Sequence, residues 1–277
     1  MLVTLSTDFG AASPYVAAMK GVLLSVNPEA RLLDLSHSLP PQNIRHAAHF
    51  LAQAAPYFPA GTLHVCVVDP GVGSERAILY AEAGSQRLLA PDNGCLTEVL
   101  RVLGGAKQIR RVTEKKFWRP SVSSTFHGRD IFAPVAGHLS RGVTPAEIGP
   151  AVTDMVRLHL PQPRKGESWL EGEVAFVDDF GNLISNVPVD MLPPVFQVTI
   201  GAQEIRRFVR SYAEAKPGEL VALISSDGHL EIALVNGNAA HRLRAESGTA
   251  VTVRAEPAKQ PLPRKAMPAQ TQKRKKT

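Results

Sequence analysis

The first 68 residues alternate short apolar runs with helix-forming segments, and this alternation limits the possible folds more than any other feature. Runs of this length and apolar content are typical of buried strands. The predicted strands are Leu2–Ser6, Arg31–Leu35 and Leu63–Val68, and the predicted helices cover 14–26 and Ile44–Ala55. Short connections between such elements favour parallel strands. We therefore predict an α/β fold in which a Rossmann-like, mostly parallel sheet is flanked by helices.

Two capping residues mark the expected helix starts. Ser13 precedes Pro14, and a proline at the first helical position is harmless because that N–H has no partner inside the helix. The second helix is expected to begin after Asn43, whose side chain can accept from a backbone N–H of the first turn.

The loop after the third strand, VVDPGVGSER at 67–76, combines an aspartate, two glycines and an arginine. In an open α/β sheet, ligands bind outside the carboxyl ends of the strands. Asp69 and Arg76 would then face a cleft. The alternative is a turn that ends the strand and carries a surface ion pair, and this segment alone does not decide between the two.

The pattern weakens further along the chain. We expect strands over 77–81, 87–90 and 108–112 and helices over 94–103 and 131–142. Pro134 puts the first half of the last helix in doubt, because proline lacks the N–H that a helix interior needs.

The character of the sequence changes near residue 160. Short β-rich segments then alternate with turn signals such as KPGE and SSDGH, which is typical of a small antiparallel barrel. We predict an α/β catalytic domain at 1–155, a linker at 156–168, a C-terminal β-barrel domain at 169–254 and a basic, disordered tail at 255–277.

The net positive charge is confined to the end of the chain. Residues 255–277 hold seven basic residues and one acid, which accounts for the whole net charge of +6. Such a tail suits a solubilising extension or a weak acidic partner, but the neutral body gives no reason to expect a specific nucleic acid. Cys66 and Cys95 lie in apolar surroundings and are expected as buried thiols. Without a membrane-spanning run or a secretory signal, we expect a cytoplasmic protein.

Four polar clusters follow predicted strand ends or turns. They are Asp8 in TDFG, Asp69 with Arg76, His127 in TFHGRD, and Asp178, Asp179 and Asn182 in DDFGN. Each also has a structural explanation, with Asp8 as a helix cap, His127 as a packed histidine and DDFGN as a β-turn. Phosphate-loop, metal and serine-hydrolase chemistry find little support, because their glycine, ligand and G-x-S-x-G spacings do not occur.

Seven motifs occur in order along the chain: TDFG, HSLPPQNI, VVDPGVGSER, APDNG, TFHGRDIFAP, DDFGN and SSDGHLEIA. This set covers about residues 1–255 and resembles the S-adenosylmethionine (SAM) hydrolases, also called SAM hydroxide adenosyltransferases, with fluorinase and chlorinase as halide-using relatives. The resemblance implies an N-terminal α/β domain, a smaller C-terminal β domain, and a homotrimer with its substrate between neighbouring subunits. It also implies hydrolysis of SAM to adenosine and L-methionine with no cofactor and no metal.

Differences from the halide-using branch favour hydrolysis. Fluorinase has tyrosine where this chain has Asp69, a Tyr-Ser pair where it has His127 and Gly128, and an insertion before the segment similar to APDNG. The hydrolases resemble this chain in an Asp, Arg, His set, carried over as Asp69, Arg76 and His127. A carboxylate opposes a halide anion but favours a polarised water. A SAM-dependent halogenase and a non-catalytic SAM or adenosine sensor are the alternatives.

The same resemblance assigns substrate contacts. Asp8 would accept from both ribose hydroxyls, and Asn182 would bind the adenine edge, with Phe180 stacking nearby and the backbone at Val235 close to the base. Candidates for the methionine end are Asp178, Asp179, Ser226 and Glu231. Asp227 stands where fluorinase has an arginine, so the resemblance leaves open which residues hold the methionine carboxylate.

The expected reaction is an in-line attack of water on ribose C5′. Complete proton transfer from water, with a pKa near 15.7, to a histidine with a pKa near 6.5 would cost about 12 kcal/mol. The water should therefore lose its proton as the C–O bond forms, while Asp69, Arg76 and His127 hold it. Arg76 stays protonated and cannot be the base. Whether Asp69 or His127 takes the proton is open at this point.

Overall fold

A computed structural model describes residues 1–256, and the predicted tail from residue 257 onward lies outside the described residues. The described chain forms two compact units, the first covering Met1–Leu160 and the second beginning at Pro161. Each unit has its own sheet and its own hydrophobic core. The fold is therefore mixed α/β with two sheets.

A seven-stranded sheet forms the centre of the first unit. Its strands are β1 (Leu2–Thr7), β2 (Arg31–Ser36), β3 (Leu63–Val67), β4 (Ile78–Ala83), β5 (Gln86–Pro91), β6 (Ala106–Arg111) and β7 (Ala151–Val152). They lie in the order β2-β1-β3-β5-β4-β6-β7. Neighbours from β2 to β5 are parallel and those from β5 to β7 are antiparallel. The sheet is therefore partly parallel, and its parallel part contains the three strands with the clearest sequence pattern.

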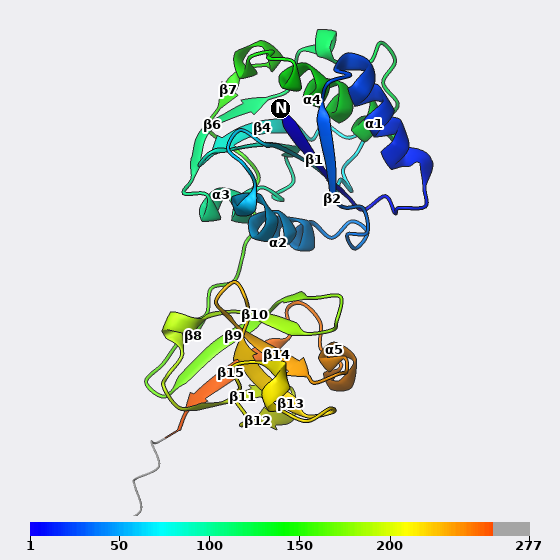
Figure 1. Cartoon of the computed structure of the whole chain (residues 1–277). Helices are drawn as coiled ribbons and strands as arrows, with labels where there is room; N and C mark the ends of the chain where they lie inside the picture. The colour runs from blue at the N-terminus through cyan, green and yellow to red at the C-terminus, as the bar shows by residue number, and fades with distance from the viewer. Residues whose placement is uncertain (257–277) are drawn as a thin grey trace, which may run out of the picture. The chain divides into compact units, whose positions relative to one another are not determined.

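Helices cover both faces of this sheet. The longer ones are α1 (Pro14–Val26), α2 (Ile44–Ala54), α3 (Thr97–Val102) and α4 (Ala133–Ser140), and short 3₁₀ turns occupy Ala55–Tyr57, Lys115–Phe117 and Pro145–Ile148. Figure 1 shows α1 and α4 on one face and α2 and α3 on the other. Both faces of the central strands are thus buried, which explains why β3 is apolar throughout.

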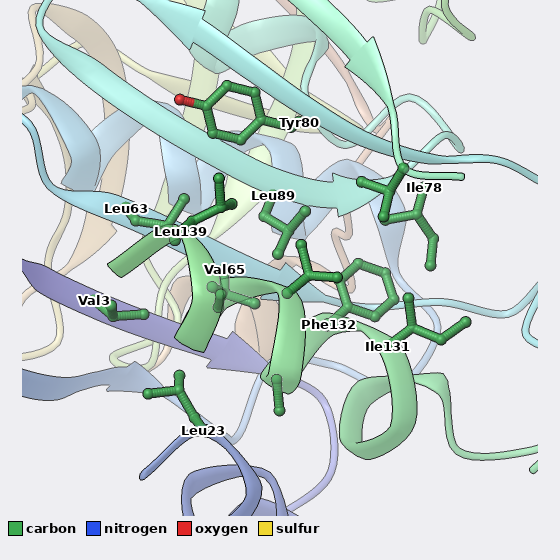
Figure 2. Close-up of a cluster of buried hydrophobic side chains, with 14 of the residues drawn as sticks. Val3, Leu23, Leu63, Val65, Ile78, Tyr80, Leu89, Ile131, Phe132 and Leu139 are labelled. Carbon is green, nitrogen blue, oxygen red and sulfur yellow. The ribbon is translucent and has the colours of Figure 1, made fainter. Parts of the chain in front are cut away.

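Alternate residues of β3 enter different cores. Val65 and Val67 belong to the cluster beneath α1 and α4, with Leu23 and Phe132 (Figure 2). Cys66 belongs to the opposite cluster, beneath α2 and α3. This period of two places a rigid, fully packed strand directly before Asp69.

Three local expectations meet different outcomes. Asn43 caps α2 as predicted, its side chain accepting from the N–H of His46 at 2.9 Å. Ser13 precedes α1 but does not cap it, because its hydroxyl donates to the carbonyl of Phe9 at 2.8 Å. The doubt over Pro134 is resolved by a π-helical turn, Gly128–Phe132, after which the proline falls in the first turn of α4.

The second unit is an antiparallel sheet that nearly closes into a barrel. Its strands are β8 (Arg164–Lys165), β9 (Trp169–Val177), β10 (Leu183–Pro188), β11 (Phe196–Ile200), β12 (Gln203–Ile205), β13 (Leu220–Ile224), β14 (His229–Leu234) and β15 (Ala250–Ala255). Their order is β12-β11-β15-β9-β10-β14-β13, with β8 on β9. A bridge between Phe208, just after β12, and Ala222 of β13 brings the two edges together. A short helix, α5 (Ala239–Leu243), was not predicted.

Two further expectations concern single features. Cys66 and Cys95 are both buried free thiols, as predicted. Within residues 1–256, no helix combines the length and apolar character that crossing a membrane requires.

Candidate active site

The carboxyl ends of β1 and β3 bring two of the predicted clusters to one edge of the sheet. Thr7, the last residue of β1, pairs with Val67, the last residue of β3. Asp8 and Asp69 therefore begin adjacent loops at the edge where open α/β sheets bind ligands. The ring of Phe9 packs edge-on against Phe126, with centroids 5.8 Å apart, so the segment before His127 joins the same edge.

Arg76 connects Asp69 to His127. Its Nε lies 2.9 Å from both carboxylate oxygens of Asp69, and its Nη2 bonds to Asp69 Oδ2 and lies 2.8 Å from His127 Nδ1. The side chains of Asp69 and Arg76 are only 4% and 10% exposed. The loop therefore holds a buried, forked ion pair, which rules out the surface ion pair considered above.

The contact with Arg76 determines the tautomer of His127. A guanidinium can only donate, so His127 Nδ1 is the acceptor and the ring proton lies on Nε2. Burial and the charge of Arg76 lower the pKa of His127 below its ordinary value, against the opposing charges of Asp69 and Asp130. At neutral pH the imidazole is thus uncharged and presents an N–H donor on its other side.

A carboxylate that sequence reasoning missed anchors the segment carrying His127. Asp130 is fully buried and accepts from Arg119, Arg129 and the backbone N–H of Ser123 at 2.7–2.9 Å. Burial alone would raise the pKa of Asp130, but the bonds from Arg129, Ser123 and Arg119 lower it to about 2. Asp130 belongs to the TFHGRD motif, so the sequence did draw attention to this segment. Its partners Arg119 and Ser123, eleven and seven residues earlier, were not predictable.

Gly73 allows the loop of Asp69 to approach this segment. Its φ is +80°, and a Cβ there would lie 2.3 Å from the carbonyl oxygen of Ser124. Only glycine fits such a position without a backbone shift. The absence of a side chain at Gly73 therefore lets the loop of Arg76 lie close enough to the segment of His127 for the two side chains to bond.

A cleft of about 670 Å³ opens beside this pair within the first unit. Arg76 and His127 both line it, together with Ile78, Trp118 and Ile131. The buried ion pair therefore has one side next to a solvent-accessible space.

The carboxylate of Asp8 is held by a backbone group from the segment after β2. Its Oδ2 accepts from the backbone N–H of Gln42 at 2.8 Å. Asp8 therefore does not cap the helix after Ser13, and the structural explanation offered for it above is wrong. Oδ1 has no donor among residues 1–256, which leaves it available to a ligand.

The DDFGN segment of the second unit is a turn organised by its first aspartate. Asp178 Oδ1 accepts from the N–H groups of Phe180 and Asn182 at 2.9 and 2.8 Å, and Oδ2 accepts from Asn182 Nδ2 at 2.9 Å. Asn182 is buried, and no donor among residues 1–256 bonds to its Oδ1. The turn is completed by Gly181, whose Cβ position is occupied by the side chain of Asn238 at the start of α5.

The remaining candidates occupy different environments. Glu231 is buried and accepts from the hydroxyl of Tyr212 at 2.5 Å, and burial, with the charges of Asp178 and Asp227, raises its pKa. Phe180 is 78% exposed, and Asp179 and Ser226 are exposed as well. Both backbone groups of Val235 are already paired, with Glu219 and Gly218. Tyr212 was not predicted, because its place beside Glu231 depends on the closure of the barrel.

Metal ligands do not gather in the described part of the chain. Within residues 1–256, no three His, Cys, Asp or Glu side chains are placed to hold an ion together.

Comparison with known proteins identifies the family. Residues 3–149 match the SAM hydroxide adenosyltransferase N-terminal domain, and residues 172–252 match the C-terminal domain of the same family. The chain belongs to the SAM hydroxide adenosyltransferase family. It is 38% identical to a (R)-S-adenosyl-L-methionine hydrolase of Salinispora tropica over 91% of this chain and 97% of that protein.

Two further comparisons, with a halide-using relative and with a solved structure, show lower identity. A fluorinase from an Actinoplanes strain is 26% identical, over 91% of this chain and 97% of that protein. A crystal structure of an uncharacterised conserved protein from Thermotoga maritima superposes with a TM-score of 0.85 at 35% identity, covering 92% of this chain and all of that one. Identity is therefore higher to the hydrolase than to the fluorinase.

Proposed function

We propose that this protein hydrolyses SAM to adenosine and L-methionine. The observation that carries the proposal is the buried Asp69–Arg76–His127 array at a ligand-binding sheet edge, in a chain whose relative at 38% identity is named a (R)-SAM hydrolase. That name specifies the (R) form, and we extend it to this chain as the preferred epimer at the sulfonium. Halogenation and non-catalytic sensing are not favoured.

The array suits a water that donates and accepts at once. His127 Nε2–H offers the water a donor, and Asp69 Oδ1, which within the described chain accepts only from Arg76 Nε, keeps a second lone pair that offers it an acceptor. Because Nδ1 of His127 is occupied by Arg76 and Nε2 already carries a proton, we assign proton acceptance to Asp69. The proton leaves as the C5′–O bond forms, the C5′–S bond breaks, and the sulfonium becomes the neutral thioether of methionine. General-base assistance of this kind is worth about 10²–10⁴-fold.

The other residues would hold the substrate. Asp8 accepts from the ribose diol, Asn182 Oδ1 accepts from the adenine amine, and Phe180 stacks on the base. The buried carboxylate of Glu231 is a candidate for the methionine ammonium, together with the exposed side chains of Asp179 and Ser226. Asp178 serves mainly to shape the turn, because it accepts three hydrogen bonds from Phe180 and Asn182 within it.

Several broader features belong to the same proposal. We assign the water-activating residues to a Rossmann-like domain at 1–155 and the adenine contacts to the barrel domain at 169–254, joined by the linker at 156–168. By family resemblance, the site is completed between subunits of a homotrimer. The buried thiols Cys66 and Cys95 favour a reducing, cytoplasmic location.

The test is hydrolysis in water labelled with oxygen-18. The purified protein is incubated with separated (R) and (S) epimers of SAM in the presence of EDTA and without halide, and products are analysed by chromatography and mass spectrometry. We expect adenosine carrying one labelled oxygen at C5′ and unlabelled methionine, formed faster from the (R) epimer. Absence of adenosine from both epimers would refute the proposal, and a dependence on added metal would refute its mechanism.

A further inference from the structure

The segment 37–42 closes over the loop that carries Asp8. The backbone N–H of Gly10 donates to the carbonyl of His37 at 2.8 Å, and the N–H of Leu39 lies 3.4 Å from the carbonyl of Thr7. The segment follows β2, which pairs in parallel with β1 (Figure 1). Two sequence motifs that are 30 residues apart thus form one unit around the proposed ribose carboxylate.

The end of this segment has an unusual backbone. Gln42 has a φ of +60°, and only two other non-glycine residues among 1–256 have a positive φ, Asn236 and Arg244. This conformation directs the N–H of Gln42 to Asp8 Oδ2 at 2.8 Å. Left-handed backbone at a residue that is not glycine persists only where surrounding contacts hold it, and it concentrates at functional sites.

A chain of side chains holds the start of the segment. The carboxylate of Asp34 can only accept, and its Oδ1 lies 3.0 Å from His37 Nε2, which assigns the ring proton to Nε2. With that tautomer Nδ1 is an acceptor, and the hydroxyl of Thr7, 3.0 Å away, donates to it while accepting from the N–H of Phe9 at 3.3 Å. Lys20 lies 2.5 Å from the other oxygen of Asp34. The His37 side chain is 8% exposed, with Nδ1 hydrogen-bonded to Thr7 and Nε2 close to the Asp34 carboxylate.

We propose that His37 is a positioning residue for ribose recognition, acting through Thr7 and Gln42 on Asp8. By anchoring the segment 37–42 to Thr7, the imidazole keeps the N–H of Gln42 on one oxygen of Asp8. The carboxylate is thereby oriented before substrate arrives, and its free lone pairs face the ribose diol. Preorganisation of this kind increases affinity by reducing the ordering that binding requires. The inference rests on the proposed function, because it takes Asp8 as the ribose acceptor.

The test measures affinity for the ribose hydroxyls rather than activity. Calorimetry gives the dissociation constants of adenosine and of 2′,3′-dideoxyadenosine, which lacks both hydroxyls, for the full-length wild type and its variants. We expect His37→Ala and Thr7→Val to raise the dissociation constant of adenosine about 5- to 10-fold, which corresponds to the loss of roughly one hydrogen bond. The affinity for the dideoxy ligand should not change. His37→Asn, whose amide oxygen can stand in for Nδ1, should restore most of the loss.

A matched control separates positioning from general destabilisation. His138 is a partly buried histidine of the same unit, packed against Phe117 with ring centroids 5.0 Å apart, and it lies in α4, outside the segment 37–42. His138→Ala should leave both affinities unchanged. An equal loss for both ligands in the His37 and Thr7 variants, or no loss in either, would overturn the inference. If the wild type itself binds both ligands equally, the ribose role of Asp8 fails, which concerns the proposed function instead.

Discussion

Replacement of Arg76 by lysine isolates the function of its forked guanidinium. Lysine keeps a positive charge beside the buried carboxylate of Asp69 but cannot bond to Asp69 and His127 through a planar group at once. Each charge-assisted hydrogen bond is worth about 1.5–3 kcal/mol. Loss of the bond to His127 should therefore lower kcat about 10- to 100-fold, at 1.4 kcal/mol per factor of ten. Alanine is a poorer choice, because an unpaired buried charge costs about 3–5 kcal/mol of stability.

The assay follows adenosine release at saturating SAM, with thermal unfolding recorded for each variant. Arg110 supplies a matched control, since it also makes two hydrogen bonds through its guanidinium, to Gln108 at 3.0 Å and to the carbonyl of Gly149 at 3.1 Å. Arg110→Lys should leave kcat unchanged, and Arg76→Lys should leave KM nearly unchanged because substrate contacts are assigned to other residues. A kcat for Arg76→Lys within twofold of the wild type would show that the fork is not needed to hold the water.

Three further outcomes are expected. Protonation of His127 removes the acceptor at Nδ1, and the pKa of His127 is lowered below 6.5. We therefore expect kcat to stay constant through neutral and alkaline pH and to fall only on the acid side of pH 6.5. A fall of kcat centred above neutrality would contradict this assignment. Burial lowers the pKa of His64 from 6.5 to about 4, so the unfolded chain binds the extra proton in this window. The free energy of unfolding should thus drop by up to about 3 kcal/mol from pH 6.5 towards 4, at 1.36 kcal/mol per pKa unit, and urea unfolding of His64→Gln should lack this drop. Gly73→Ala should reduce kcat because its Cβ would strike the carbonyl of Ser124, whereas Gly104→Ala, with φ +83° and no neighbour within 4 Å, carries the same backbone strain and should retain kcat.

Local patterns predicted the parallel part of the first sheet well, because its strands are short and β1 and β3 are buried on both faces. The predicted helix over 14–26 matches α1, and Asn43 caps α2 as expected. Elements fixed by tertiary contacts were less accessible. The helix α5 has five residues and follows the cap Asn238, whose side chain packs against Gly181 of the DDFGN turn. No periodicity could reveal so short an element.

The candidate site shows the same division. The motifs identified which residue types gather at the sheet edge, but not which atoms they use on each other. Nothing in VVDPGVGSER reveals that Arg76 donates to His127 Nδ1, yet that bond determines the tautomer and with it the proton acceptor. The same holds for Asp130, whose buried carboxylate joins residues that lie well before it in the chain. Such contacts between segments that are far apart in the chain depend on tertiary packing, which local patterns in one sequence do not reveal.

The structure also changes the reason why Asp69 favours water over a halide. Sequence reasoning attributed the preference to repulsion between a carboxylate and an anion. Arg76 neutralises that carboxylate in a buried pair, so net repulsion is largely cancelled. Hydrogen bonding supplies the stronger argument, because a halide can accept from His127 Nε2–H but cannot donate to Asp69. A halide would add no donor to the Asp69 oxygens, which within the described chain then accept from Arg76 alone, whereas water donates to Asp69, accepts from His127 and supplies the proton that Asp69 takes.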